Sequence, residues 1–77
     1  MNYNMDNVKF IVLKDRFDTE RFVNINSINE FWFDEDNKYL RICYISGGFT
    51  DLEVESLEYF LKYLNKARQS DVMIVYP

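Results

Sequence analysis

The chain contains no histidine, and its 77 residues include a single cysteine, Cys43. These two absences exclude most routes to nucleophilic catalysis, thiol chemistry and transition-metal binding, which depend on imidazole and thiolate groups. One cysteine also forbids an internal disulfide. We therefore expect no metal and no cofactor. Small domains usually gain extra stability from a disulfide, a metal or a partner, so association with another protein is the remaining source.

Glycine is scarce as well, with only the adjacent pair Gly47 and Gly48. Two glycines are too few for a phosphate-cradling loop, but they supply the positive φ angles of a tight hairpin. No serine has a histidine to activate it, and the sequence places no cleft around its carboxylates. We expect a protein that is not an enzyme and has no catalytic residues.

The chain also lacks long apolar runs and targeting signals. No run approaches the roughly 20 residues of a transmembrane helix. Residues 1–6 lack the basic and apolar regions of a signal peptide. The lone cysteine lies in the apolar run Ile42–Ile45, where it is most simply a buried small hydrophobe. A cytoplasmic protein without membrane contact is expected.

The charge is acidic and unevenly spread. The net charge is −4, but residues 30–58 carry eight acidic side chains against Lys38 and Arg41, which gives −6. Residues 1–29 balance to zero, and residues 59–77 sum to +2. An acidic block of this size opposes binding to nucleic-acid phosphates and anionic membranes, so direct nucleic-acid binding is not expected.

Apolar residues make up 48% of the chain and aromatic residues 18%, which is high for a chain of this length and indicates a folded domain. We expect one domain over residues 1–77, with residues 1–6 flexible. Period-two alternation and turn residues predict strands. The predicted strands cover residues 8–13, 21–25, 28–33, 39–45 and 50–55. The third strand is either separate from the second or a bent extension of it beyond Asn26-Ser27.

A helix is predicted over about residues 57–68 because apolar side chains recur on one stripe: Leu57, Phe60, Leu61 and Leu64. Ser56 has the chemistry of its N-cap. A rival interpretation begins the helix at Thr50, since Thr50-x-x-Glu53 matches a capping box, but the alternation there favours a strand. Residues 72–76 are a short closing strand or an apolar tail. The predicted class is α+β: a small, curled, barrel-like antiparallel sheet of about four or five strands with one C-terminal helix packed on it.

Three consecutive aromatic residues, Phe31-Trp32-Phe33, make both faces of their strand apolar, because neighbouring strand residues point to opposite sides. One helix covers one face. The other must be covered by closure of the sheet, by the C-terminal segment or by another molecule. Trp32 is therefore a candidate partner contact.

Two tyrosines of the predicted helix are further candidates. Tyr59 lies about 150° and Tyr63 about 110° from the centre of the apolar stripe. Tyrosine is enriched at interface hot spots, which favours a partner-binding role. The alternative is that both shield the edge of the core while their hydroxyls stay in water.

Acidic residues form two groups. Asp51, Glu53 and Glu55 lie on one strand face at intervals of about 6.6 Å, which resembles the phosphate repeat of a single strand. They are partner-binding candidates; the alternative is an edge strand that charge protects from aggregation. Residues 34–36 carry three carboxylates, but their spacing matches no EF-hand loop, so a solvated hairpin tip is expected and no metal site.

The order of features from Val8 to Leu64 resembles the small FlbD-type flagellar-operon proteins and similar short β-rich bacterial and phage proteins. The shared features are the stretch F-x-N-x-x-x-I at Phe22, Asn24 and Ile28, a charged hairpin, a glycine turn, and Glu55-Ser56 before the closing helix. The resemblance implies a non-enzymatic accessory protein and transfers no site residues.

The leading functional hypothesis is a protein-interaction module: a homodimer or other homo-oligomer, or an accessory or inhibitor subunit, of phage-like type, that binds a larger host protein. One alternative is a small-ligand binder that holds a nucleotide-like molecule in an aromatic cleft lined by Trp32 and tyrosines. Another is an acidic mimic of nucleic acid that blocks a DNA-handling enzyme, through charges that added salt would screen.

Overall fold

The computed structural model describes residues 8–77, in which six strands and one α-helix follow one another along the chain. The elements are β1 (Phe10–Lys14), β2 (Glu20–Asn24), a 3-10 turn η2 (Ile25–Ser27), β3 (Ile28–Asp34), β4 (Tyr39–Tyr44), β5 (Phe49–Glu53), α1 (Leu57–Gln69) and β6 (Ile74–Val75). The flexibility expected of residues 1–6 lies outside the described residues. In residues 8–77, no helix combines the length and the apolar character that crossing a membrane requires.

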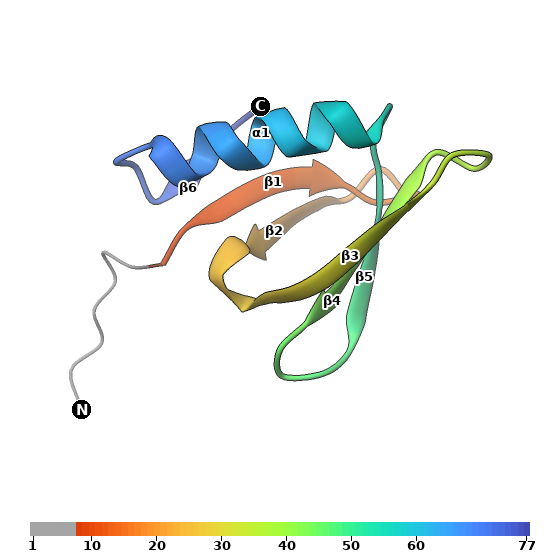
Figure 1. Ribbon diagram of the computed structural model, residues 1–77, viewed down its shortest axis with the longest axis horizontal. Coiled ribbons are helices and arrows are strands. Elements are labelled where there is room, and N and C mark those ends of the chain that lie inside the picture. The colour runs from red at the N-terminus through yellow and green to blue at the C-terminus, as the bar shows by residue number, and fades with distance from the viewer. Residues whose placement is uncertain (1–7) are drawn as a thin grey trace.

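The strands form two three-stranded sheets, with the orders β2-β1-β6 and β3-β4-β5 (Figure 1). The α+β class is confirmed. The single barrel-like antiparallel sheet is not: the two sheets are open, and β6 runs parallel to β1. The division arises at η2, where the Asn24 side chain accepts a hydrogen bond from Asn26 N and Ser27 Oγ donates to the Asn24 carbonyl. These bonds turn the chain, as short polar side chains do, so that β3 begins a second sheet.

The core lies between the inner faces of the two sheets and the helix. Its fully buried large side chains are Ile11, Val23, Leu40, Ile42, Leu52 and Phe60. Figure 1 shows α1 lying along β1, with the hairpins of the second sheet extending to one side. Phe31 closes the core from β3, where its ring meets the Phe60 ring edge-on at 5.1 Å between centroids.

The helix begins where expected, and the start at Thr50 is wrong because β5 occupies that segment. Ser56 Oγ accepts a hydrogen bond from Tyr59 N at 3.0 Å. The predicted stripe is rotated, however: Leu57 and Leu61 are exposed. The residues of α1 that are buried are Phe60, Tyr63, Leu64 and Ala67. Ala67 is small enough to let the helix approach the sheets, and the hydroxyl group of Tyr63 finds polar partners in the core.

Tyr63 joins the helix to the first sheet. Its hydroxyl accepts a hydrogen bond from Val12 N at 2.8 Å and donates to the Val75 carbonyl. The short β6 pairs only with Phe10 and Ile11 of β1, so the next amide of β1, that of Val12, has no strand partner on this side. The tyrosine hydroxyl therefore continues the hydrogen-bond ladder where β6 ends. Of the two alternatives for residues 72–76, a closing strand or an apolar tail, the structure shows the strand, over Ile74–Val75 only.

Candidate functional site

The strongest candidate surface is the face of β3-β4-β5 that points away from the core. The register places Trp32 of β3, Arg41 of β4 and Asp51 of β5 side by side across the three strands. Tyr39 and Phe49 lie on the same face, two residues from Arg41 and Asp51 along their strands. We call these five residues the outer sheet face. Their neighbours in sequence, such as Phe31 and Leu40, point inward to the core.

Arg41 contacts three other residues of the outer sheet face. Its Nε and an Nη donate to the two carboxylate oxygens of Asp51 at 2.7 and 2.9 Å, which is a bidentate ion pair. The guanidinium carbon lies 4.0 Å from the centroid of the Phe49 ring and 5.5 Å from that of Trp32. Arginine favours such planar contacts with carboxylates and aromatic faces. The cluster is therefore held in one geometry before any partner arrives.

The electrostatics of the pair match this geometry. The hydrogen bonds from Arg41 lower the pKa of Asp51 below its ordinary value, and Asp51 in turn raises the pKa of Arg41. Both rings remain accessible: Trp32 is 47% exposed and Phe49 is 56% exposed. The rings of the Phe31–Phe33 run do point to both sides of β3: Phe31 and Phe33 pack against the core, and Trp32 is exposed. The expected second apolar face is only partly apolar, because the Arg41–Asp51 ion pair lies beside Trp32.

A groove of about 470 Å³ separates the β1–β2 hairpin from β5. Its lining residues are Asp15, Arg16, Phe17, Arg21, Arg41, Phe49, Thr50 and Asp51. The carboxylate of Asp15 shapes the hairpin by accepting hydrogen bonds from Phe17 N at 2.8 Å and Thr19 N at 3.0 Å. The turn leaves Phe17 80% exposed at its tip.

The pKa of Asp15 reflects opposing effects. Desolvation raises it, but the hydrogen bonds from Thr19 and Phe17 and the ion pair with Arg21, at 3.4 Å, lower it, and the net shift is downward. The carboxylate is thus ionised at neutral pH and keeps the hairpin in its observed shape.

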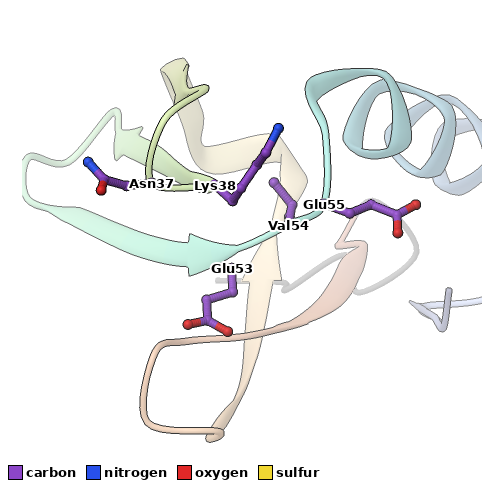
Figure 2. Close-up of a pocket in the computed structure, with 5 residues that line it drawn as sticks. All are labelled: Asn37, Lys38, Glu53, Val54 and Glu55. Atoms are coloured by element: carbon purple, nitrogen blue, oxygen red, sulfur yellow. The ribbon is translucent and has the colours of Figure 1, made fainter.

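Two neighbouring grooves are lined mainly by polar side chains. One, of about 420 Å³, is lined by Arg16, Asn37, Tyr39 and Glu53. The other, of about 370 Å³, is lined by Asn37, Lys38, Glu53, Val54 and Glu55 and is drawn in Figure 2. Trp32 lines none of these three grooves, so the aromatic cleft expected around it is not formed by them.

The acidic row Asp51, Glu53 and Glu55 does not present three equivalent charges. Asp51 is neutralised by Arg41, and Glu55 lies beyond the end of β5. Figure 2 shows the side chains of Glu53 and Glu55 extending in different directions. The structure therefore breaks the regular spacing that the alternation in sequence predicts.

The two helical tyrosines have different surroundings. Tyr63 is only 4% exposed, so the expectation that it contacts a partner is corrected: its ring and hydroxyl belong to the core. Tyr59 is half-buried and packs against the core, with its ring 6.4 Å from that of Tyr63. Its exposed part remains available, and its role in binding stays a prediction.

The sequence did not point to three residues of the outer sheet face, Tyr39, Arg41 and Phe49, or to Phe17 of the adjoining groove. Phe17 reads as part of a turn, and Phe49 follows the glycine pair without belonging to the predicted strand. The signal that could have found Arg41 and Phe49 is cross-strand register, since a hairpin turning at Gly47-Gly48 places Arg41 opposite Asp51.

No three metal-ligating side chains gather anywhere in residues 8–77. At the acidic tip of the β3–β4 hairpin, the carboxylate of Asp34 accepts hydrogen bonds from the Asn37 side chain and from the amides of Asp36 and Asn37. The bond from the Asn37 side chain is the first cause of the lowered pKa of Asp34. This carboxylate is thus engaged in shaping the turn.

No family model, curated protein or solved structure matches the chain. The resemblance to FlbD-type flagellar proteins therefore stays a prediction, and the function is argued from the geometry of the candidate surface.

Proposed function

We propose that the chain is a non-enzymatic protein-interaction subunit that contacts its partner through the outer sheet face. The observation that carries this proposal is the exposed cluster in which Arg41, fixed by Asp51, lies against Trp32 and Phe49. Tryptophan and arginine dominate the energetics of protein interfaces. A cluster that is already ordered loses little side-chain entropy on binding.

The exposed rings supply enough surface to drive association. An aromatic side chain buries roughly 150–250 Å² when fully covered. About half of Trp32 and of Phe49 is still in water. Covering the rest of each ring would remove roughly 75–125 Å² from solvent, or about 2–3 kcal/mol per ring at about 25 cal/mol/Å².

The role that fits this surface is that of a cytoplasmic accessory or inhibitor subunit. The two other hypotheses receive less support from the geometry. Trp32 lies outside the three grooves described above, which disfavours an aromatic ligand cleft around it. The pairing of Asp51 with Arg41 interrupts the row of charges that mimicry of nucleic acid would use.

The test is site-specific photo-crosslinking in cells that express the chain, with a benzophenone amino acid in place of Glu30. Glu30 is exposed and lies two residues from Trp32 on the same strand face. The adduct is identified by mass, and the partner is then purified and titrated against the wild-type chain and two variants, Trp32→Ala and Leu61→Ala. Leu61 is an exposed apolar residue of α1 and serves as the matched control.

Loss of the Trp32 ring is expected to weaken binding by roughly 10- to 100-fold, which is the effect of removing a hot-spot residue. The Leu61→Ala variant should bind as the wild type does. Equal affinity of all three proteins, or the absence of any adduct, would refute the proposal. Near-UV circular dichroism of both variants verifies that the fold is retained.

A further inference from the structure

The groove between the β1–β2 hairpin and β5 carries an excess positive charge in an acidic protein. Three arginines and two aspartates line it. Arg41 is paired with Asp51, and Arg21 with Asp15. Arg16 forms no ion pair in the described residues 8–77. The groove thus sums to +1 on a chain whose net charge is −4, and within this groove the charge of Arg16 is the one that no carboxylate pairs with. Glu53 lies with Arg16 along the neighbouring groove but forms no ion pair with it.

The charge of Arg16 influences the side of the groove that β5 lines. After Arg41, which has the larger effect, Arg16 also lowers the pKa of Asp51 through its charge. Because Arg16 lines the groove together with Phe49, Thr50 and Asp51 of β5, a carboxylate that enters the groove would meet its guanidinium.

Two exposed aromatic rings line the same groove. Phe17 belongs to the hairpin and Phe49 to the start of β5. An apolar side chain lodged between them would cover both rings, and a single exposed arginine beside them would select an acidic neighbour. The groove thus combines one apolar and one anionic recognition element.

The backbone of β5 adds a third element. β5 is an edge strand, and in the described residues no backbone hydrogen bond joins it to β1. The hydrogen bonds from Tyr44 N to the Gly48 carbonyl and from Val54 N to the Lys38 carbonyl show that the even-numbered residues in and beside β5 direct their amides and carbonyls toward β4. The amides and carbonyls of Phe49 and Asp51 therefore point away from β4. Where β5 lines the groove, at Phe49, Thr50 and Asp51, an extended segment can pair with this edge.

The size of the outer sheet face argues against a second copy as the main occupant. Three strands about 4.8 Å apart and five to seven residues long, at about 3.3 Å per residue, span roughly 280 Å². A stable dimer buries about 800 Å² on each partner. A face of this size suits a strand-sized segment better than a flat, symmetric contact.

We infer that this groove binds an extended segment of the partner protein, with a carboxylate at Arg16 and an aliphatic or aromatic side chain between Phe17 and Phe49. The inference rests on the proposed function and names the chemistry of the partner. Successive side chains of an extended segment point to opposite faces, so neighbouring side chains on the same face stand two positions apart. We expect this spacing between the acidic and the apolar residue of the bound segment.

The experiment is selection of a displayed library of random ten-residue peptides against the full chain. The expected consensus is Asp or Glu two positions from an aromatic or aliphatic residue. The best peptide is then synthesised with a fluorophore and titrated by fluorescence polarisation against the wild type and the Arg16→Gln, Phe49→Ala and Lys62→Gln variants. Lys62 is an exposed helical cation and serves as the matched control.

Arg16→Gln and Phe49→Ala should each weaken binding about tenfold or more, and Lys62→Gln should leave it unchanged. A peptide with Asn or Gln in place of its acidic residue should lose as much affinity as the Arg16→Gln variant does. The loss should not increase when both changes are combined, because they remove the same contact. The peptide variant leaves the protein untouched, so a folding defect cannot produce this pattern.

Other outcomes overturn the inference. These are a failure to enrich peptides, a consensus without an acidic residue, or affinity that Arg16→Gln does not change. A doubled solution mass that Arg16→Gln abolishes would assign the groove to a second copy, and an oligonucleotide that competes with the peptide would assign it to nucleic acid. If Trp32→Ala releases the crosslinked partner and Arg16→Gln does not, the groove assignment fails while the proposed function survives.

Discussion

Replacing Tyr63 with phenylalanine removes only one oxygen atom, but it should lower the free energy of unfolding markedly. The hydroxyl accepts from Val12 N and donates to the Val75 carbonyl, and the Val12 carbonyl lies 3.3 Å away. All three residues are buried. Phenylalanine keeps the ring in the core but leaves an amide and a carbonyl without a partner.

The magnitude follows from the two groups left unpaired. A buried donor or acceptor that loses its partner costs about 1–3 kcal/mol. We expect Tyr63→Phe to lower the free energy of unfolding by about 2–6 kcal/mol, against a typical total of about 5–15 kcal/mol. In a domain of this size each kcal/mol corresponds to about 4–8 °C, so the melting temperature should fall by roughly 10 °C or more.

Urea denaturation followed by Trp32 fluorescence measures the change, and Tyr59→Phe is the matched control. In residues 8–77 the Tyr59 hydroxyl makes no hydrogen bond, so its removal should change the free energy of unfolding by less than about 0.5 kcal/mol. Hydrogen exchange of the Val12 amide should accelerate in Tyr63→Phe. A Tyr63→Phe variant as stable as the wild type would refute the argument that the hydroxyl completes the β1 ladder.

Three further predictions concern the cap, the ion pair and the glycine turn. Ser56→Ala removes the acceptor for Tyr59 N and should cost about 1 kcal/mol in urea denaturation; an unchanged midpoint would contradict the cap. The folded-state pKa of Asp51 lies below its unfolded value of about 3.9, so the pair with Arg41 stabilises the fold above about pH 4 and is lost as the pH falls further. Asp51→Asn should therefore be less stable at pH 7 and lose less stability between pH 5 and pH 2, and identical pH profiles would exclude this contribution. Gly47 has a φ of +99° with open space around its Cα, so Gly47→Ala should cost about 1–2 kcal/mol through backbone strain alone, and thermal melts of the variant check this value.

Most local elements could be predicted because their causes lie within a few residues of chain. Ser56 caps the helix through an amide three positions away. The Gly47-Gly48 pair adopts positive φ because glycine lacks the Cβ that disfavours it. The polar side chains of Asn24 and Ser27 bend the chain between β2 and β3. In each case the interacting groups are neighbours, so the sequence pattern contains the cause.

The candidate site was only partly predictable. Trp32 could be identified as a candidate because neighbouring strand residues point to opposite sides, so three consecutive aromatic residues leave a ring on the face that the helix does not cover. Arg41 and Phe49 become significant only through the register of β4 with β5, which brings the guanidinium onto the ring and the Asp51 carboxylate. Phe17 joins them only because the β1–β2 hairpin lies against β5.

Amino-acid order alone indicated the order and the approximate positions of the strands, the turns and the helix. The tertiary structure decided how those elements combine: two sheets rather than one, a parallel β6, and a helix turned so that Tyr63 is buried and Leu61 is not. The physical reason is that the interacting residues are far apart in the sequence. The bond between Tyr63 and Val12 joins residues 51 positions apart, and its partners exist only after both sheets and the helix have packed. The spacing of apolar residues along a helix contains no information about such a distant partner. It therefore predicts that the helix is amphipathic but not how the helix is rotated about its axis.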